Sequence, residues 1–436
     1  MPTSLLGLAS KAQSKKQYVF RDLYVLINED FLHDCWRLIH KDAACGVDRI
    51  SAGQYEENLD GNIHDLVERL KRNYYHAKLV RRHYIPKPDG RLRPLGIPAI
   101  EDKLLQLAVA RILQAIYEQD FLSCSFGYRP GRSPIDAVFE LDRQLQFGRY
   151  NFVVEADIKG FFDNLNQDKL IEMLSIRIDD RRLLRLIKKW LKAGVLDTDG
   201  KVIHPATGTP QGGIVSPILA NVFLHYVLDL WFQTVVLVSS RGKAFMIRFA
   251  DDFVCAFENQ EDADQFYKVL ELRLDQFGLC LAPDKTRVIP FSRSDKSGAF
   301  RFDFLGFEFH WGFDRKGKDH IIRRTSRKKL RNSLHSFTQW CRLNRNLPKS
   351  LLFLKLSQKL RGYFNYYAIT GNFEGIKEFY DQAIRILWKW LNRRSQRRSL
   401  NWQGFNDLLK HFRLPRPRII HHQPPHPKTL VSRGFA

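Results

Sequence analysis

Two adjacent carboxylates, Asp251 and Asp252, stand between two apolar runs and constrain the fold more than any other feature of the chain. Residues 244–250 predict one strand and residues 253–257 a second, so the pair lies at a tight hairpin turn. Two carboxylates this close repel each other and raise each other's pKa. A third acid, Asp157, ends another apolar run. One interpretation of Asp251–Asp252 is a solvated turn. The other is a site for two Mg²⁺ ions that catalyses phosphoryl transfer, because such a site takes its carboxylate ligands from the ends of two strands.

The excess positive charge of the chain is confined to its C-terminal part. The 436 residues carry a formal net charge of +23, enough length for two or three domains. Residues 313–436 contain 28 Lys and Arg against 6 Asp and Glu, whereas residues 1–312 contain 42 against 41. This distribution is typical of a polyanion-binding module attached to a nearly neutral body. A membrane-binding face is the alternative, but polar side chains interrupt the longest apolar stretch, residues 214–238, which we interpret as a buried helix.

The cysteines and the N-terminal segment indicate the cellular compartment of the protein. The six cysteines are scattered and form no Cys-x-x-Cys pair, which excludes a Cys-based zinc ribbon and favours a reducing compartment. Lys11, Lys15 and Lys16 lie in an N-terminal segment without acids, which faintly resembles an organellar transit peptide. We favour a plain basic leader and a bacterial cytoplasmic, nucleoid-associated protein.

Apolar periodicity divides the chain into regions of different secondary structure. Residues 20–80 predict helices, and residues 81–98 predict strands with a hairpin at Asp89–Gly90. A helix from Glu101 to Tyr117 follows, and helices and strands alternate to about residue 311. Residues 323–412 are helical and basic, Gly317–Lys318 indicates a domain joint, and a Pro- and His-rich tail begins at Pro415 and is expected to be poorly ordered.

Four sequence blocks follow one another in a definite order. They are Ile85–Pro98, Asp157–Asn164, Gly208–Asn221 and Arg248–Asp252. Any one block could mislead, but four in this order are specific. From about residue 20 to 415 the chain resembles the reverse transcriptases encoded by bacterial and organellar group II introns. Residues 125–131, 281–286 and 304–307 match the same family.

The resemblance implies a right-hand polymerase with α/β fingers and palm followed by an all-α basic thumb. It assigns a basic leader to residues 1–20, fingers and palm to 21–316, a maturase-specific thumb (domain X) to 317–414 and a basic tail to 415–436. Many relatives carry a further Cys-containing endonuclease domain. No cysteine follows Cys341 here, so we expect no second-strand DNA cleavage from these residues.

The resemblance also implies roles at the catalytic centre. Asp157, Asp251 and Asp252 match the acids that hold two Mg²⁺ ions. Residues that match positions contacting the incoming dNTP are Lys87, Arg93, Phe162, Gln211 and Lys285. Among them Phe162 matches the steric gate against the 2′-hydroxyl, and Lys285 a lysine that protonates pyrophosphate. Without the family, Lys87 and Arg93 are also typical surface charges, and Phe162 a typical core ring. Leu305 and Gly306 match the turn that holds the primer end, and Phe249 stands where the family usually has tyrosine.

The basic C-terminal region predicts the RNA contacts, because neutralising phosphates with Lys and Arg releases counterions. The predicted contacts are Arg323, Arg324, Arg327, Lys328, Lys329, Arg361, Arg393, Arg394, Arg397 and Arg398. The aromatic residues between 360 and 368 are expected to be mostly packed in helix core.

The sequence therefore predicts an RNA-directed DNA polymerase of a group II intron. The implied partners are intron RNA, an RNA template with a DNA primer, target DNA and dNTPs, with no membrane and with homodimer formation left open. The implied roles are binding intron RNA, assisting splicing, and target-primed reverse transcription in retrotransposition. One alternative is a splicing-only maturase, although such proteins tend to lose their acids. Another is a domesticated relative in repair or defence, which the DNA flanking the gene would distinguish.

Overall fold

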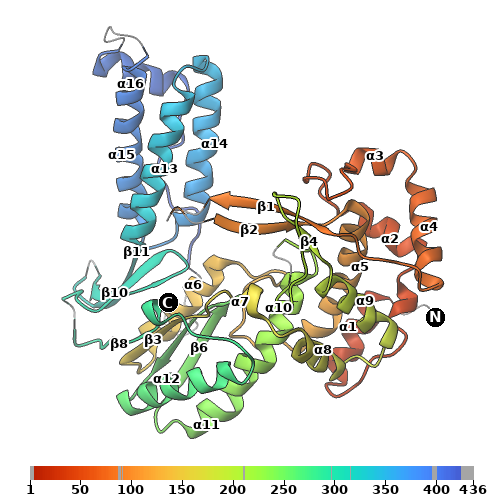
Figure 1. The fold of residues 1–436 in the computed structure, drawn as a ribbon. Helices are drawn as coiled ribbons and strands as arrows, with labels where there is room; N and C mark the ends of the chain where they lie inside the picture. The colour runs from red at the N-terminus through yellow and green to blue at the C-terminus, as the bar shows by residue number, and fades with distance from the viewer. Residues whose placement is uncertain are drawn as a thin grey trace, which may run out of the picture.

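The computed structural model describes residues 4–86, 90, 92–209, 212–295, 297–314, 316–394 and 400–423. Of the predicted site residues, Lys87, Gln211, Arg397 and Arg398 lie outside the described residues. Helices of the N-terminal half and a central sheet form the lower body in the view of Figure 1, and a bundle of C-terminal helices stands on the sheet side of this body.

The central sheet has the strand order β6-β7-β3-β8, with all neighbours antiparallel. Its strands are β3 (Phe152–Asp157), β6 (Ala244–Phe249), β7 (Asp252–Phe257) and β8 (Arg287–Pro290). Both faces are covered: Val154 and Phe253 face the large core shared with the N-terminal helices, while Val153 and Val254 face a second core. Burial on both faces explains why these strands read as continuous apolar runs. The central sheet thus confirms the strand pairing predicted from residues 244–257.

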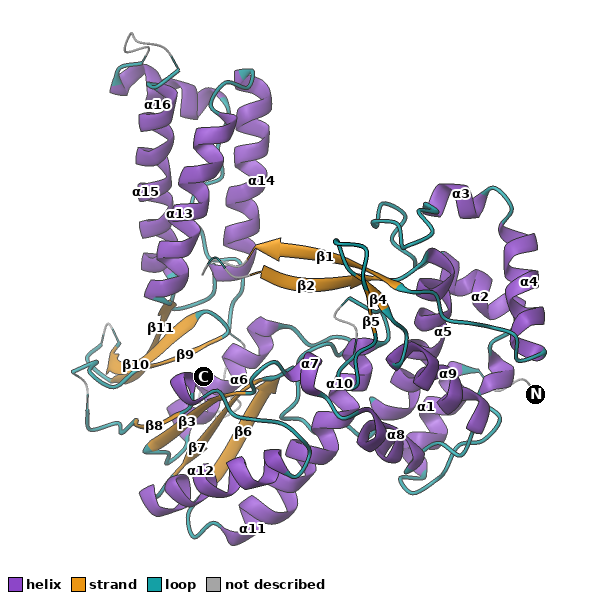
Figure 2. Cartoon of the chain, in the orientation of Figure 1, coloured by secondary structure: helices purple, strands orange, loops and turns teal. Residues whose placement is uncertain are grey.

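A hairpin sheet lies between the N-terminal helices and the bundle in Figure 2. Its order is β2-β1-β4-β5, from β1 (Val80–Pro86), β2 (Leu92–Ile97), β4 (Val195–Leu196) and β5 (Val202–Ile203). Strands β1 and β2 pair antiparallel, which confirms the predicted hairpin. Gly90 in its turn has a φ of 83°, a backbone conformation that favours glycine.

The N-terminal helices include the segment expected to be a leader. They are α1 (Leu5–Ser14), α2 (Glu29–Trp36), α3 (Ala52–Glu56), α4 (Leu59–Lys71) and α5 (Ile100–Tyr117). Helix α1 packs on α5 and buries Leu8 and Ala12. The expectation of a plain basic leader is therefore corrected, because apolar residues at helical spacing among the lysines give this segment a packing face. The predicted helix from Glu101 to Tyr117 is confirmed as α5.

The remaining helices of the body surround the central sheet. They are α6 (Pro134–Phe147), α7 (Phe161–Asn164), α8 (Gln167–Ser175), α9 (Arg181–Leu191), α10 (Ser216–Leu224), α11 (Leu237–Ser239) and α12 (Gln260–Asp275). Two π-helical turns, His225–Asp229 and Phe232–Val236, join α10 to α11. Within the described residues, Ser216–Ser239 is the one helix apolar and long enough to cross a membrane, and half of its most apolar window is buried. Its packing into the main core supports the reading as a buried helix.

A third sheet connects the body to the bundle. It contains β9 (Phe302–Phe304), β10 (Phe307–Phe313) and β11 (Asp319–Thr325) in the order β11-β10-β9. Gly317 lies in the turn between β10 and β11, so the residues expected to mark a domain joint lie inside a hairpin. The helical pattern expected from residue 323 begins later, because residues 323–325 complete β11.

The bundle has a core of its own. Its helices are α13 (Arg327–Asn344), α14 (Lys349–Tyr367), α15 (Phe373–Leu391) and α16 (Trp402–His411). After α16 the chain returns to the base of the bundle, where Ile420 and His421 donate backbone hydrogen bonds to the Ala368 carbonyl. Gln423 contacts Arg323 and Asp142. The expected disorder of the tail is thus corrected for its residues up to 423, because these polar contacts tie them down.

Candidate active site

The three acids singled out in the sequence lie together at one end of the central sheet. Asp157 is the last residue of β3 and Asp252 the first of β7, and the strand register pairs them directly. Directly opposed residues on antiparallel strands have Cβ atoms about 5 Å apart. Ala250 and Asp251 form the turn between β6 and β7, and Ala250 has a φ of 58°. The hairpin thus brings Asp251 and Asp252 to the end of the strand that carries Asp157.

The electrostatics of this cluster are unfavourable without a cation. Burial, followed by the charges of Asp157 and Asp251, raises the pKa of Asp252 to about 7. Burial also raises the pKa of Asp251, with a further contribution from Asp157. The ammonium of Lys285 forms an ion pair with Asp157. One exposed lysine offsets only part of the charge of three carboxylates, so the cluster favours binding of a further cation.

The donor set fits a hard divalent metal. Mg²⁺ prefers carboxylate oxygens, usually one or two carboxylates together with substrate phosphates and water. Among the described residues, no three His, Cys, Asp or Glu side chains form a ready-made metal site. The Lys285 ammonium contacts the Asp157 carboxylate from the open side of the cluster. Lys285 is 61% exposed, so its ion pair is weak and its side chain is free to move when a metal binds.

Arg248 stabilises the Ala250–Asp251 turn through a buried hydrogen-bond network. Its side chain is fully buried. The guanidinium donates to both carboxylate oxygens of Asp229 at 2.6 and 2.5 Å, to Ser125 Oγ at 2.8 Å, to Asn221 Oδ1 at 3.2 Å and to the Ala250 carbonyl at 2.9 Å. Asp229 ends a π-helical turn, a feature frequent at functional sites. The network fixes the carbonyl of the left-handed turn residue that precedes Asp251.

A pocket of about 600 Å³ opens beside the acids. Its lining includes Arg93, Tyr128, Asp157, Phe162, Asp163, Gly213, Ser216, Asp251 and Lys285. Phe162 is half-buried, whereas its neighbour Phe161 is 2% exposed and belongs to the main core. Burial and the charge of Asp251 raise the pKa of Tyr128, while Arg93 lowers it, and all three side chains line this pocket. Acids, an aromatic wall and a guanidinium thus share one pocket.

Comparison with known proteins agrees with this geometry. The family model of reverse transcriptases (RNA-dependent DNA polymerases) matches residues 85–309. This chain belongs to the reverse transcriptase family. It is therefore a polymerase fold of the palm-and-fingers type, mixed α/β, with a C-terminal helical region.

The similar proteins include products of group II introns. The chain is 37% identical over 233 residues to the group II intron-encoded protein LtrA of Lactococcus lactis subsp. cremoris, a match to 51% of this chain and 38% of that protein. It is 31% identical over 326 residues to protein YkfC of Escherichia coli, a match to 67% of this chain and 83% of that protein. A 91 kDa protein in the cob intron of Schizosaccharomyces pombe is 38% identical over 211 residues, 47% of this chain and 25% of that protein. The chain thus covers well under two thirds of the Lactococcus protein, and the predicted resemblance to group II intron proteins is confirmed.

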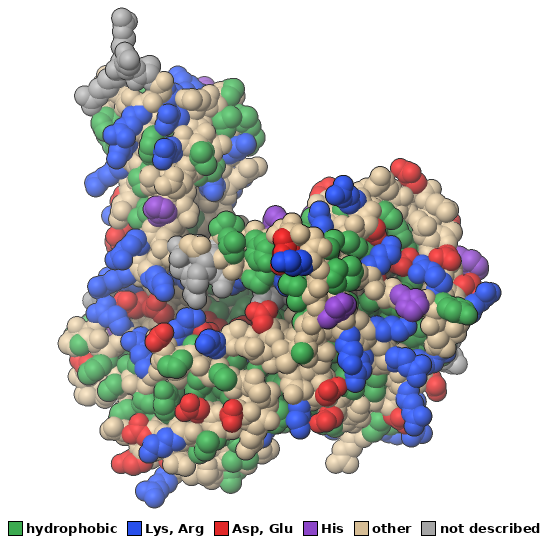
Figure 3. Space-filling model, viewed as in Figure 1, with side chains coloured by type: hydrophobic (Ala, Val, Ile, Leu, Met, Phe, Trp, Pro, Cys, Tyr) green, Lys and Arg blue, Asp and Glu red, His purple; other side chains and the backbone are tan. Residues whose placement is uncertain are grey.

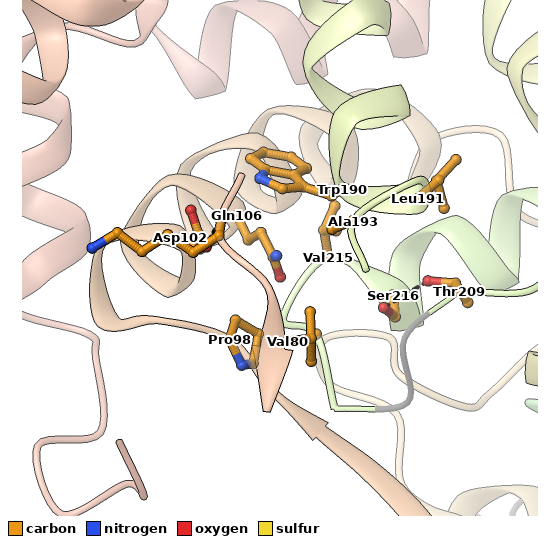
Figure 4. A pocket seen from close by; sticks show the side chains of 12 residues that line it. Val80, Pro98, Asp102, Gln106, Trp190, Leu191, Ala193, Thr209, Val215 and Ser216 are labelled. Carbon is orange, nitrogen blue, oxygen red and sulfur yellow. Dashed lines mark hydrogen bonds between the residues drawn. The ribbon is translucent and has the colours of Figure 1, made fainter. Parts of the chain in front are cut away.

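In this reverse transcriptase the loop before α10 is held from both sides. Thr209 donates from its backbone to the Phe162 carbonyl at 2.8 Å, which ties the loop to α7. Thr209 and Ser216 line a small pocket of about 10 Å³. Figure 4 shows the hydrogen bond that Thr209 Oγ1 donates to Ser216 Oγ at 2.8 Å. Gln106 accepts a hydrogen bond from the Ile214 backbone at 2.9 Å. Thr209 and Ile214, the described residues that make these contacts, are thus both anchored.

The two glycines of this loop, Gly212 and Gly213, have different neighbours. Gly212 has a φ of 110°, and a Cβ there would lie 2.4 Å from the carbonyl oxygen of Gly96 in β2. In this structure the close approach at Gly212 is to the hairpin sheet, whereas Gly213 lines the pocket beside the acids.

Leu305 and Gly306 form the turn between β9 and β10, with φ of 50° and 83°. Tyr366 of α14 donates its hydroxyl to the Leu305 carbonyl at 2.9 Å. Burial, followed by the charge of Asp252, raises the pKa of Tyr366 to about 12. The turn expected to hold the primer end is thus joined to α14, through a side chain whose pKa responds to the charge of Asp252.

Most of the described residues predicted to contact RNA are exposed. Arg324, Arg327, Lys328, Lys329, Arg361 and Arg393 present their side chains to solvent, and Lys and Arg gather over the bundle in Figure 3. Arg394 is half-buried and donates to the Leu347 carbonyl. The expected packing of the aromatic residues is seen at Tyr363, whose ring stacks on Phe379 at 3.6 Å.

Arg323 requires a correction. Its side chain is 1% exposed and forms an ion pair with Asp142 of α6 at 3.1 Å. It lies on the inward face of β11, while Arg324 faces outward, because side chains alternate along a strand. Arg323 therefore joins the third sheet to α6 and is not accessible to RNA in this structure.

Three residues near the acids were not assigned roles from the sequence. Tyr128 and Arg248 lie within matched blocks, but nothing in the local pattern shows that one lines the pocket and the other supports the turn. Tyr366 lies in an aromatic run that is otherwise typical of helix core. Their positions depend on contacts between distant segments, which only the fold brings together.

Proposed function

We propose that this protein is an RNA-directed DNA polymerase that extends a primer 3′-hydroxyl along an RNA template with dNTPs. The observation that carries the proposal is the meeting of Asp157, Asp251 and Asp252 beside a pocket that also contains Phe162 and Arg93. Carboxylates alone suit many metal sites, but acids beside an aromatic wall and a guanidinium suit a nucleoside triphosphate.

The acids would hold two Mg²⁺ ions. When bound, these ions activate the attacking hydroxyl and offset charge on the phosphates. Asp157 and Asp251 would provide the most direct ligands. Asp252 is more deeply buried, and its raised pKa would fall once a cation is present. Arg248 contributes by fixing the turn that orients Asp251 and Asp252.

Substrate selection is assigned to the pocket lining. Phe162 would exclude a 2′-hydroxyl through the bulk of its ring. Arg93 would bind the triphosphate with its planar guanidinium, together with Lys87 and Gln211. Lys285 lines the same pocket, and its ammonium, displaced from Asp157 when a metal binds, would give a proton to leaving pyrophosphate. Leu305 and Gly306 would hold the primer end against Tyr366.

The likeness to group II intron proteins extends the proposal to RNA. We assign residues 21–316 to fingers and palm and 317–414 to a maturase-type thumb, although β11 belongs to the third sheet. The exposed cations of the bundle would bind intron RNA, assist its splicing, and support target-primed reverse transcription into target DNA. The assigned setting is the bacterial cytoplasm at the nucleoid. Homodimer formation is left to measurement.

The test is primer extension on an RNA template with dNTPs and Mg²⁺, comparing wild type with Asp251→Asn. Asp284→Asn is the matched control, because Asp284 is an exposed acid next to Lys285. Product from wild type and the control, but not from Asp251→Asn, is the expected result. Folded wild-type protein that binds RNA without making product would overturn the polymerase and favour a splicing-only maturase.

A further inference from the structure

A second concave surface lies on the bundle, away from the acids. A groove of about 1000 Å³ runs between α15, α16 and the segment that returns from α16. It shares no lining residue with the pocket at the acids. Helix α16 lies at the end of the bundle far from the central sheet (Figure 1). From Phe373 to Arg385 the groove follows α15 for roughly 18 Å at 1.5 Å per residue.

The charge of this α15–α16 groove is strongly positive. Its lining contains Lys377, Arg385, Lys410, Arg413 and Arg416, against one acid, Asp381. All five cations are exposed. Of these five cations, only Lys410 forms an ion pair with a described residue. Its partner is Asp407 at 3.9 Å, and both side chains are largely exposed. Four cations without a paired acid among the described residues, beside a fifth whose ion pair is exposed, favour a polyanion along the groove.

The same groove presents aromatic rings. Trp402 is 48% and Phe373 44% exposed, and Tyr380, which lines the same groove, is half-buried. Trp402 keeps one side on Trp388, with ring centroids 5.6 Å apart, so its position is fixed although it is open to solvent. Exposed rings next to a track of cations are the arrangement that binds unpaired nucleic acid, in which bases stack and phosphates meet Lys and Arg.

We propose that the α15–α16 groove binds an unpaired strand of nucleic acid. The inference rests on the proposed function for its setting, because a polymerase that copies intron RNA has single-stranded RNA at hand. A duplex fits the observations less well, since its bases already stack on one another. The chain's own residues after Gln423 include Lys428 and Arg433 and no acid, so their charge does not complement the groove.

The direct test is fluorescence anisotropy of a 5′-labelled 12-nucleotide oligouridylate with the full-length protein. An excess of unlabelled template–primer duplex fills the polymerase cleft, so that the signal reports a separate site. We expect Trp402→Ala to weaken binding about 5- to 150-fold, the effect of losing one base stack. Trp402→Phe, which keeps a ring, is expected to restore most of the affinity and shows that loss in the alanine variant is not unfolding.

Charge removal provides an independent readout. The double variant Lys377→Gln/Arg413→Gln should lower the slope of log affinity against log salt by about 1.4, if each cation meets one phosphate of a single strand. Arg342→Gln/Lys355→Gln removes two exposed charges of the same bundle outside the groove and is the control. Equal losses in both double variants, or unchanged binding in the Trp402 and Lys377 variants, would overturn the proposal.

The remaining arms identify the strand and separate this proposal from the polymerase. A blunt RNA duplex that binds the groove as tightly as the oligouridylate refutes single-strand binding. Oligouridylate bound more tightly than oligodeoxythymidylate identifies RNA, and the reverse order identifies an unpaired DNA strand as the ligand. Primer extension on a short template should be unchanged in the groove variants, while Asp251→Asn should retain groove binding, so the two proposals fail separately.

Discussion

Replacing Arg248 by methionine tests how the catalytic turn is held. Methionine fills the space of the unbranched arginine stem with an apolar side chain. It removes all the hydrogen bonds that the guanidinium makes to Asp229, Ser125, Asn221 and Ala250. Asp229 is 0% exposed, so its carboxylate is left buried without its cation. Removal of one partner of a buried ion pair costs about 3–5 kcal/mol. We therefore expect Arg248→Met to lower the free energy of unfolding by this amount.

The double variant Arg248→Met/Asp229→Leu separates stability from positioning. It removes the unpaired charge as well, and replacing both members of a buried pair by apolar side chains is often neutral. We expect it to recover most of the lost stability. Polymerase activity should stay about 100-fold below wild type, because the Ala250 carbonyl is no longer held and a shift of about 1 Å at a catalytic group costs that much.

The assays are denaturant unfolding followed by tryptophan fluorescence, and single-turnover primer extension at saturating dNTP. The reasoning is refuted if Arg248→Met loses less than about 1 kcal/mol. It is also refuted if the double variant regains both stability and activity, because the network would then act on folding alone.

Further predictions concern the pocket and its surroundings. Phe162→Ala is expected to increase incorporation of ribonucleotides relative to dNTPs by about tenfold or more in a competition assay. Phe161→Ala should instead lower the free energy of unfolding by about 3–5 kcal/mol, because Phe161 is buried in the core. The pKa of Asp252, about 7, lies above the pKa of the same side chain in the unfolded chain, so the folded form binds more protons. The stability of the metal-free protein should therefore fall as pH rises from about 4 through 7. Asp252→Asn or added Mg²⁺ should flatten this pH dependence in thermal melts. Tyr366→Phe removes the hydrogen bond to the Leu305 carbonyl, worth about 0.5–1.5 kcal/mol, and should shorten products on a long template while leaving single-nucleotide addition near wild type.

The sequence predicted the parts of this fold that depend on local pattern. The hairpin around Asp251 and Asp252 could be predicted, because apolar runs broken by two acids have few other solutions in a sheet. Helix α5 could be predicted because its apolar residues recur at helical spacing over eighteen residues. The leader and tail were harder, since short segments of mixed polarity are ordered by partners elsewhere, α5 for one and Arg323 and Asp142 for the other.

Long-range contacts account for what the sequence could not predict at the site. Arg323 and Arg324 are chemically identical, and only the pleat of β11 decides that one pairs with Asp142 while the other faces solvent. Arg248 likewise depends on Ser125 and Asp229, which lie 123 and 19 residues away along the chain. No local pattern records such partners.

The catalytic acids and the residues that orient them differ in how strictly their side-chain types are required. The acids must be acids whatever surrounds them, because only hard anionic oxygens suit Mg²⁺, and this requirement is visible in the sequence. The groups that orient them need only fill space and satisfy hydrogen bonds, which many combinations of residues can do. Arg248 with Asp229 is one such combination. If the double apolar variant folds but fails to polymerise, the buried pair serves to set the geometry of the turn and not to stabilise the fold, since its net worth against an apolar replacement is then close to zero.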